Sequence, residues 1–161
     1  MLRKQPKTQV INAIDITWAH RVLLFNLIIG RTDCGIGRFE NSVVTSEGKF
    51  YEIDNEFIGI KITRQLTTHL THKNEKLIKI DTHWTLLNSN IANTPFSSEV
   101  KKEFSQIQSA TLFYKVEAKL MIPGIQENIK ENLTKIQNCL CANIENNNYT
   151  PSDLQCDLSE G

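Results

Sequence analysis

The sequence lacks an excess of charge of either sign. Lys and Arg together number 18, Asp and Glu also number 18, and the formal net charge at pH 7 is therefore zero. Proteins that bind nucleic acid or an anionic membrane usually carry a basic patch or stripe. No block of like charges forms one here. We therefore expect no nucleic-acid partner.

The sequence also has no apolar run of the length that crosses a bilayer, which is about 20 residues. The longest run covers residues 22–29 and is interrupted by Asn26. The first seven residues are basic, as at the start of a signal peptide, but Asn12, Asp15 and Arg21 interrupt the apolar stretch that should follow. We expect no integral membrane segment and no secretion, and hence a protein of the cytoplasm or of an organelle stroma such as that of a plastid.

Cysteine is scarce, and the four thiols are Cys34, Cys139, Cys141 and Cys156. In a reducing compartment such thiols stay free. Cys139 and Cys141 are two residues apart in a segment with helical periodicity, where their side chains point in different directions. We expect neither a disulfide nor a metal pair between them. Cys34 precedes Gly35 in a Gly-containing stretch that is more typical of a turn than of a phosphate-binding loop.

Histidine does not form a recognisable metal-binding pattern. His69, His72 and His83 are close in sequence, but no cysteine or carboxylate completes a ligand set at the usual spacing. His20 and Asp15 are equally unconvincing as a catalytic pair. The sequence therefore predicts no metal site, no cofactor and no identifiable catalytic residue.

The period of the apolar residues changes at Pro123. Upstream, residues 111–121 alternate between apolar and polar side chains, which predicts a half-buried strand. Downstream, apolar residues recur at helical spacing over a long segment, at Ile125, Ile129, Leu133, Ile136, Leu140 and Ile144. Proline suits the first turn of a helix because it has no amide hydrogen to leave unpaired. We expect a strand that leads directly into a long amphipathic helix.

Further elements follow from the same patterns. Alternation predicts strands over residues 10–16, 57–70 and 77–86, and a hairpin of 39–45 with 49–53 around the turn at 46–48. Residues 17–29 fit either short helices or a buried strand, and we favour helix. A short helix is expected over 97–104. The polar residues 149–161 are expected to form a flexible tail after a single domain of residues 1–148.

The strand that ends at Pro123 carries Thr111, Tyr114 and Glu117, and the step after it reads Ile122-Pro123-Gly124. This join resembles the START-like superfamily (SRPBCC; polyketide cyclase/dehydrase, Bet v 1-type), and most of all its uncharacterised cyanobacterial and plastid members. The resemblance implies an α+β helix-grip fold, in which a curved antiparallel sheet wraps around the long C-terminal helix and leaves a cavity. It implies no catalytic residue, since the superfamily shares no catalytic motif.

The resemblance implies the binding of a small, mostly hydrophobic ligand between sheet and helix. The candidate ligand-binding residues are Ile62, Arg64, Trp84, Tyr114, Ile129 and Leu133. Arg64 shares an alternation face with Ile62, so it would point a guanidinium into the cavity, unless it lies near a strand end and reaches solvent. Trp18 is expected in the interior as well. Two alternatives stay open: a non-catalytic assembly or protein-interaction factor with a filled core, and a cyclase- or hydrolase-type enzyme that acts in the cavity.

Overall fold

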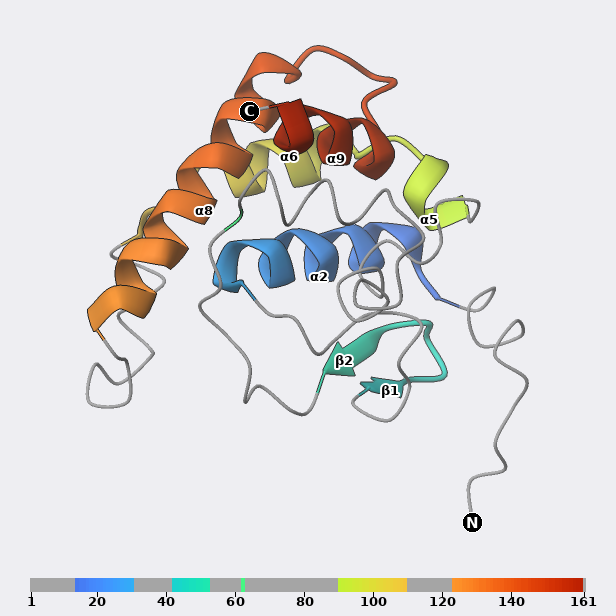
Figure 1. The fold of residues 1–161 in the computed structure, drawn as a ribbon. Helices are drawn as coiled ribbons and strands as arrows, with labels where there is room; N and C mark the ends of the chain where they lie inside the picture. The colour runs from blue at the N-terminus through green and yellow to red at the C-terminus, as the bar shows by residue number, and fades with distance from the viewer. Residues whose placement is uncertain (1–13, 31–41, 53–61, 63–89, 110–122, 161) are drawn as a thin grey trace.

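The structure is a computed structural model, and it describes residues 14–30, 42–52, 62, 90–109 and 123–160 (Figure 1). Its elements in chain order are α2 (Ile16–Ile29), β1 (Ser42–Val44), β2 (Phe50–Glu52), α5 (Asn90–Asn93), α6 (Ser98–Ser105), α8 (Pro123–Ala142) and α9 (Pro151–Glu160). Figure 1 shows α2 in the middle, with the β1–β2 hairpin on one side and α6, α8 and α9 on the other.

Local signals at both ends define α2. The side chain of Asp15 accepts a hydrogen bond from the backbone N–H of Trp18 at 2.7 Å, which satisfies one of the free donors of the first turn. The helix ends at Gly30, whose φ of 65° lies in the left-handed region that glycine adopts without a Cβ clash. The prediction of helix over residues 17–29 is confirmed.

The expected hairpin is also confirmed. β1 and β2 pair antiparallel, with Val43 opposite Tyr51, and the turn between them contains Gly48 at a φ of 80°. The N–H of Asp15 donates to the carbonyl of Gly48 at 2.8 Å, so the hairpin turn is tied to the start of α2. This bond places β2 beside the N-terminal half of that helix.

The two helices expected in the second half of the chain are present. α6 begins after Ser97, whose hydroxyl accepts from the N–H of Val100 at 3.1 Å. α8 begins at Pro123, where the apolar period changes, and ends at Ala142, two residues before the last apolar position of the predicted stripe. Four members of that stripe are buried: Ile129, Leu133, Ile136 and Leu140.

The prediction of a helix-grip fold is wrong for the part of the chain that the structure describes. This part is mostly helical, and its only sheet is the two-stranded β1–β2 hairpin. α8 packs against α2, α6 and α9, where we had expected a curved sheet. The reason is that an apolar stripe shows that a helix face is covered but not what covers it. Here the cover comes largely from other helices, with Leu24, Leu27 and Ile28 of α2 in the same core.

Three of the expected strands, at 57–70, 77–86 and 111–121, lie outside the described residues, apart from Ile62. The strand expected at 10–16 conflicts with the structure at its end, because Asp15 caps α2 and Ile16 is the first residue of that helix. Residues 10–13 lie outside the described residues.

The tail differs from the expectation of a flexible segment. Residues 151–160 form α9, and Tyr149, Leu154 and Leu158 are buried in the main core. The N–H of Thr150 donates to the Asp153 carboxylate at 2.9 Å, and the N–H of Asp153 donates back to the Thr150 hydroxyl at 3.2 Å. This reciprocal pair is a capping box that starts the helix. The acidic composition of the segment concealed this signal.

The described side chains form two apolar clusters, and α2 contributes to both. The larger one joins α2, α6, α8 and α9 with Ile62, Phe96 and Tyr149. The smaller one contains Ile14, Ala19, Leu23 and Ile91, with Trp18 and Val22 packed against it. Within the described ranges, no helix has both the length and the apolar character needed to cross a membrane.

Candidate functional site

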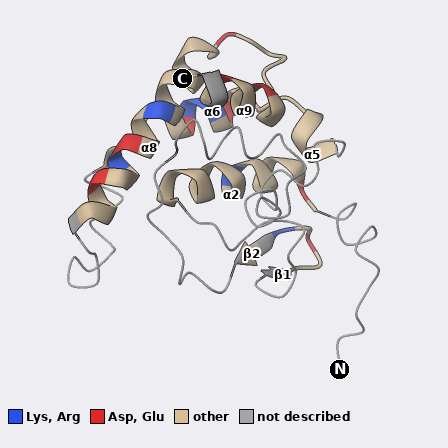
Figure 2. Cartoon of the chain, viewed as in Figure 1, with Lys and Arg blue, Asp and Glu red and all other residues tan. Residues whose placement is uncertain are grey.

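α2 is apolar on nearly all of its faces, and one of these faces is only partly covered. Trp18, Val22, Phe25 and Ile29 follow one another at intervals of four, three and four residues, which places them along one side of the helix. Phe25 is 46% exposed, and the other three are half-buried. The single Lys or Arg of this helix is Arg21, and in Figure 2 the helix is otherwise tan while α8 carries charges of both signs.

The hairpin completes this face at its N-terminal end. The ring of Tyr51 on β2 meets the indole of Trp18 edge-on, with the ring centroids 5.5 Å apart, and Tyr51 is 47% exposed. The ammonium of Lys49 lies 5.2 Å from the centre of the Trp18 ring. We call Trp18, Val22, Phe25 and Tyr51 the aromatic surface. Exposed aromatic side chains grouped in this way are unusual on a protein surface without a binding role.

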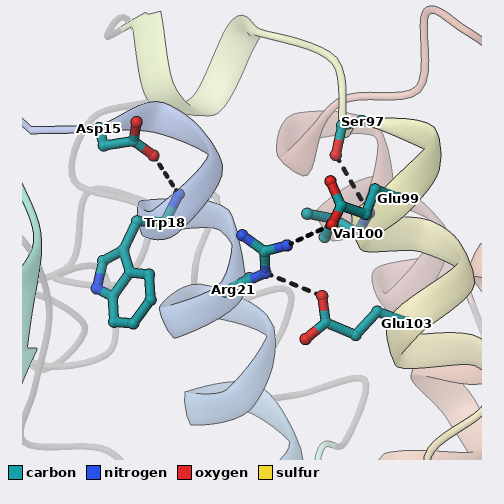
Figure 3. Close-up of polar contacts among 7 residues, drawn as sticks. All are labelled: Asp15, Trp18, Arg21, Ser97, Glu99, Val100 and Glu103. Atoms are coloured by element: carbon teal, nitrogen blue, oxygen red, sulfur yellow. Dashed lines mark hydrogen bonds and ion pairs between the residues drawn. The ribbon is translucent and has the colours of Figure 1, made fainter.

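Ion pairs with α6 hold α2 one turn away from Trp18 and Phe25 (Figure 3). The Nε of Arg21 donates to Glu103 Oε2 at 2.9 Å, and its Nη2 lies 3.5 Å from Glu99 Oε1. The hydrogen bond to Glu103 raises the pKa of Arg21 and is the largest influence on it. Figure 3 shows the Trp18 ring projecting from the side of α2 that faces away from α6. The ion pairs therefore help to set the orientation of the aromatic surface.

Three polar side chains, of which Lys101 and Asn132 are buried, bond to backbone groups of other segments. Lys101 is fully buried, and its ammonium donates to the carbonyls of Asn143 at 3.0 Å and Asn146 at 2.7 Å, just beyond the end of α8. Asn132 accepts from the N–H of Ile62 at 2.6 Å and donates to the carbonyl of Ile28 at 3.2 Å. Lys135 donates to the carbonyl of Ile62 at 2.6 Å.

Two further groups that could take part in acid–base or nucleophilic chemistry stay protonated. Tyr149 is 2% exposed and donates to Asp157 Oδ2 at 2.6 Å, and its pKa is raised, chiefly by burial and then by that hydrogen bond. Burial raises the pKa of the Cys139 thiol, and the charge of Asp157 adds to the effect. Neither group is therefore a ready nucleophile at neutral pH.

Of the six residues predicted to bind a ligand, three are described. Ile62, Ile129 and Leu133 lie together in the larger core cluster at 2–3% exposure. Arg64, Trp84 and Tyr114 lie outside the described residues, as do Cys34, His69, His72 and His83. Ile62 is brought to α8 by the bonds from Asn132 and Lys135. That these six residues line one cavity stays a prediction.

Sequence reasoning missed the aromatic surface. The spacing of Trp18, Val22, Phe25 and Ile29 was a readable signal of a third apolar face on a helix that already had two. The contribution of Tyr51 had no such signal, since the contact between β2 and α2 is tertiary. Among the residues that the structure describes, no group of three His, Cys, Asp or Glu side chains is arranged to hold a metal ion.

The resemblance to the START-like superfamily was drawn from residues 111–124, of which only Pro123 and Gly124 are described. It therefore stays a prediction from the sequence. No protein-family model, no curated protein and no solved structure matches this chain.

Proposed function

We propose that this chain is a protein-interaction module that recognises a partner polypeptide through the aromatic surface. The observation that carries the proposal is the exposure of Phe25 and Tyr51, at 46% and 47%, beside a half-buried Trp18. Trp and Tyr are enriched among the residues that dominate binding energy in protein interfaces. An exposed aromatic group loses an unfavourable contact with water when a partner covers it.

The arrangement supports recognition with little rearrangement. The Trp18 ring is already held by the edge of Tyr51 and by the ammonium of Lys49. α2, which carries the ring, is anchored to α6 by Arg21 and to the hairpin by the Asp15 N–H. Side chains that are ordered before binding lose less conformational entropy on association.

The charge of Lys49 indicates the chemistry of the partner. Lys49 lies at the edge of the aromatic surface with a side chain that is 43% exposed, and its ion pair with Glu47 spans 4.0 Å. Such a long, exposed pair contributes little and is easily exchanged. The expected partner is therefore a polypeptide segment that places apolar side chains on Phe25 and Val22 and a carboxylate on Lys49.

The packing of the described core favours a protein-interaction role over catalysis inside the core. Its apolar positions are filled by side chains from α2, α6, α8 and α9. The buried polar groups Lys101 and Asn132 bond to backbone atoms and hold the helices together.

A display selection with random peptides tests the proposal. We expect the purified protein to enrich peptides that combine apolar and acidic residues, and Phe25→Asp to abolish this enrichment. Asn138→Asp adds the same charge at an exposed position of α8 and should leave enrichment unchanged. Lys49→Glu should remove the preference for acidic residues. No enrichment, or enrichment that survives Phe25→Asp, would contradict the proposal.

Sedimentation velocity distinguishes a partner from a second copy of the chain. We expect wild-type protein to stay monomeric across the concentration range of the peptide selection. A dimer that Phe25→Asp dissociates would show that the aromatic surface joins two copies, and the proposal of a different partner would then be wrong.

The binding of a small hydrophobic molecule, which the sequence led us to expect, stays a prediction. Native mass spectrometry of freshly purified protein tests it directly. A reproducible added mass that is lost on denaturation would establish a bound molecule, and variants of Ile129 and Leu133 would then show whether the core holds it.

A further inference from the structure

His20 lies at a joint between helices with one of its two ring nitrogens unsatisfied. The side chain is 1% exposed, and its Nε2 lies 2.7 Å from the backbone carbonyl oxygen of Ile91 on α5. A carbonyl oxygen only accepts hydrogen bonds, so Nε2 carries the proton and donates. Nδ1 is buried and has no hydrogen-bond partner within the described structure.

The contacts of His20 extend beyond α5. Its ring meets the ring of Phe96 edge-on at a centroid distance of 4.9 Å. The N–H of Phe96 donates to the carbonyl of Tyr149 at 2.8 Å, and the hydroxyl of Ser152 on α9 donates to the carbonyl of Ala92 on α5 at 3.1 Å. His20 therefore joins α2 to a unit formed by α5, Phe96 and the start of α9.

Among the residues that the structure describes, no side chain stands out as a partner for a charge on this ring. α5 contains no ionisable side chain. Four carboxylates on or beside the neighbouring helices make other contacts: Asp15 caps α2, Glu99 and Glu103 pair with Arg21, and Asp157 accepts from Tyr149. The other ionisable groups on or next to the elements packed against α2 and α5 are Glu47, Lys49, Tyr51, Glu52, Lys101, Lys102, Glu127, Lys130, Glu131, Lys135, Cys139, Cys141, Asp153, Cys156 and Glu160. Desolvation lowers the pKa of His20, and only the hydrogen bond to Ile91 opposes it.

We propose that His20 is an acid-sensitive latch, in which a proton bound at Nδ1 drives the ring out of the joint and separates α5 from α2. The protonated ring places a positive charge and a donor without an acceptor among apolar side chains. The ring satisfies both nitrogens only when it reaches water. This proposal is independent of the aromatic surface and of its partner.

The direction of the pH effect follows from linkage. His20 is neutral in the folded chain, while in the unfolded chain it gains a proton near its ordinary value of 6.5. Stability is therefore fully present above about pH 6.5 and falls as the pH drops further. The midpoint of thermal unfolding should fall by roughly 3–5 °C for each pH unit between the unfolded and folded pKa values.

Thermal unfolding between pH 8 and pH 5 tests the latch with three proteins. Wild type should lose thermal stability below about pH 6.5. His20→Gln keeps an amide donor for Ile91 but cannot gain a proton, so it should lose markedly less. Asn138→Gln changes an exposed side chain of α8 and should behave as wild type. Equal losses in wild type and His20→Gln would overturn the proposal.

Hydrogen exchange and NMR of the wild type keep the test decisive if His20→Gln fails to fold. The amide of Thr94, which bonds to the carbonyl of Asn90 in α5, should lose protection below pH 6.5 after correction for intrinsic exchange. The ring nitrogens of His20 should show the Nε2–H tautomer at pH 7.5. An ordinary titration of the ring near pH 6.5 with α5 still protected would show that there is no latch.

Discussion

The ammonium of Lys101 lies 2.7 Å from the carbonyl oxygen of Asn146, in the turn that follows α8. The same nitrogen donates to Asn143, so a side chain of α6 binds two carbonyls of the turn that follows α8. These carbonyls also accept from the backbone N–H groups of Asn146 and Tyr149. A cation at this end also interacts favourably with the helix dipole. One buried lysine thus holds the C-terminal end of the longest described helix.

Lys101→Met should lower the free energy of unfolding by about 1–3 kcal/mol, because the carbonyls of Asn143 and Asn146 lose their charged donor while the stem is replaced by a side chain of similar shape. Urea denaturation measures the loss. Lys102→Met changes the exposed neighbour on the same helix and should alter stability by less than about 0.5 kcal/mol. Equal stabilities for the two variants would contradict this role of Lys101.

Asn132→Leu should destabilise the protein by about 2 kcal/mol, since the N–H of Ile62 and the carbonyl of Ile28 would both lose a partner in the core. The substitution keeps the size of the side chain, so the loss reports the hydrogen bonds rather than a cavity. Asn138→Leu, at an exposed position of the same helix, is the matched control for chemical denaturation. A stabilising effect of Asn132→Leu would show that these bonds contribute nothing net.

The pair of Arg21 and Glu103 should contribute only about 0.5 kcal/mol, because both side chains are partly exposed, at 28% and 48%. A double-mutant cycle with Arg21→Met and Glu103→Gln measures this coupling. The coupling should shrink when salt is raised from about 0.05 to 0.5 M, as screening predicts. A coupling with Glu99, which is 80% exposed and farther away, should be smaller still.

Stability should fall as the pH rises above about 10, the ordinary pKa of tyrosine. Burial and the bond to Asp157 raise the pKa of Tyr149, so the folded chain keeps a proton that the unfolded chain releases. The contribution is therefore present below pH 10 and is lost progressively above it. Tyr149→Phe should flatten the part of the alkaline stability profile that this group causes. Tyr51→Phe, at an exposed tyrosine, is the control and should keep the wild-type slope.

Local patterns predicted the elements well, and they failed where the answer depended on tertiary partners. The change of period at Pro123 gave the start of α8, and the caps at Asp15 and Ser97 fit the starts of α2 and α6. The apolar stripe on α8 is buried as predicted, but the sequence pattern favoured a sheet as the element that covers it. The strand pattern at 111–121 favoured that assignment, although the apolar faces of α2 were an equally suitable cover.

In the candidate site, too, local patterns predict one part and tertiary contacts determine the other. Phe25 lies on a face that helical spacing makes visible once α2 is known to be a helix. Tyr51 and Lys49 join it through the bond from Asp15 to Gly48, which no local pattern specifies. α9 was missed for another reason, since the capping pair of Thr150 and Asp153 was present but the acidic composition was given more weight.

The pairing of α2 with α8 constrains the order of events while the chain is being made. α2 is synthesised before α8 and is apolar on nearly every side, and Asn132, which bonds to Ile28, follows 104 residues later. At ~5–20 residues per second, synthesis leaves α2 without this cover for roughly 5–20 s. During that interval it is a natural substrate for chaperones, and a ribosome that stalls before α8 would hold an aggregation-prone nascent chain.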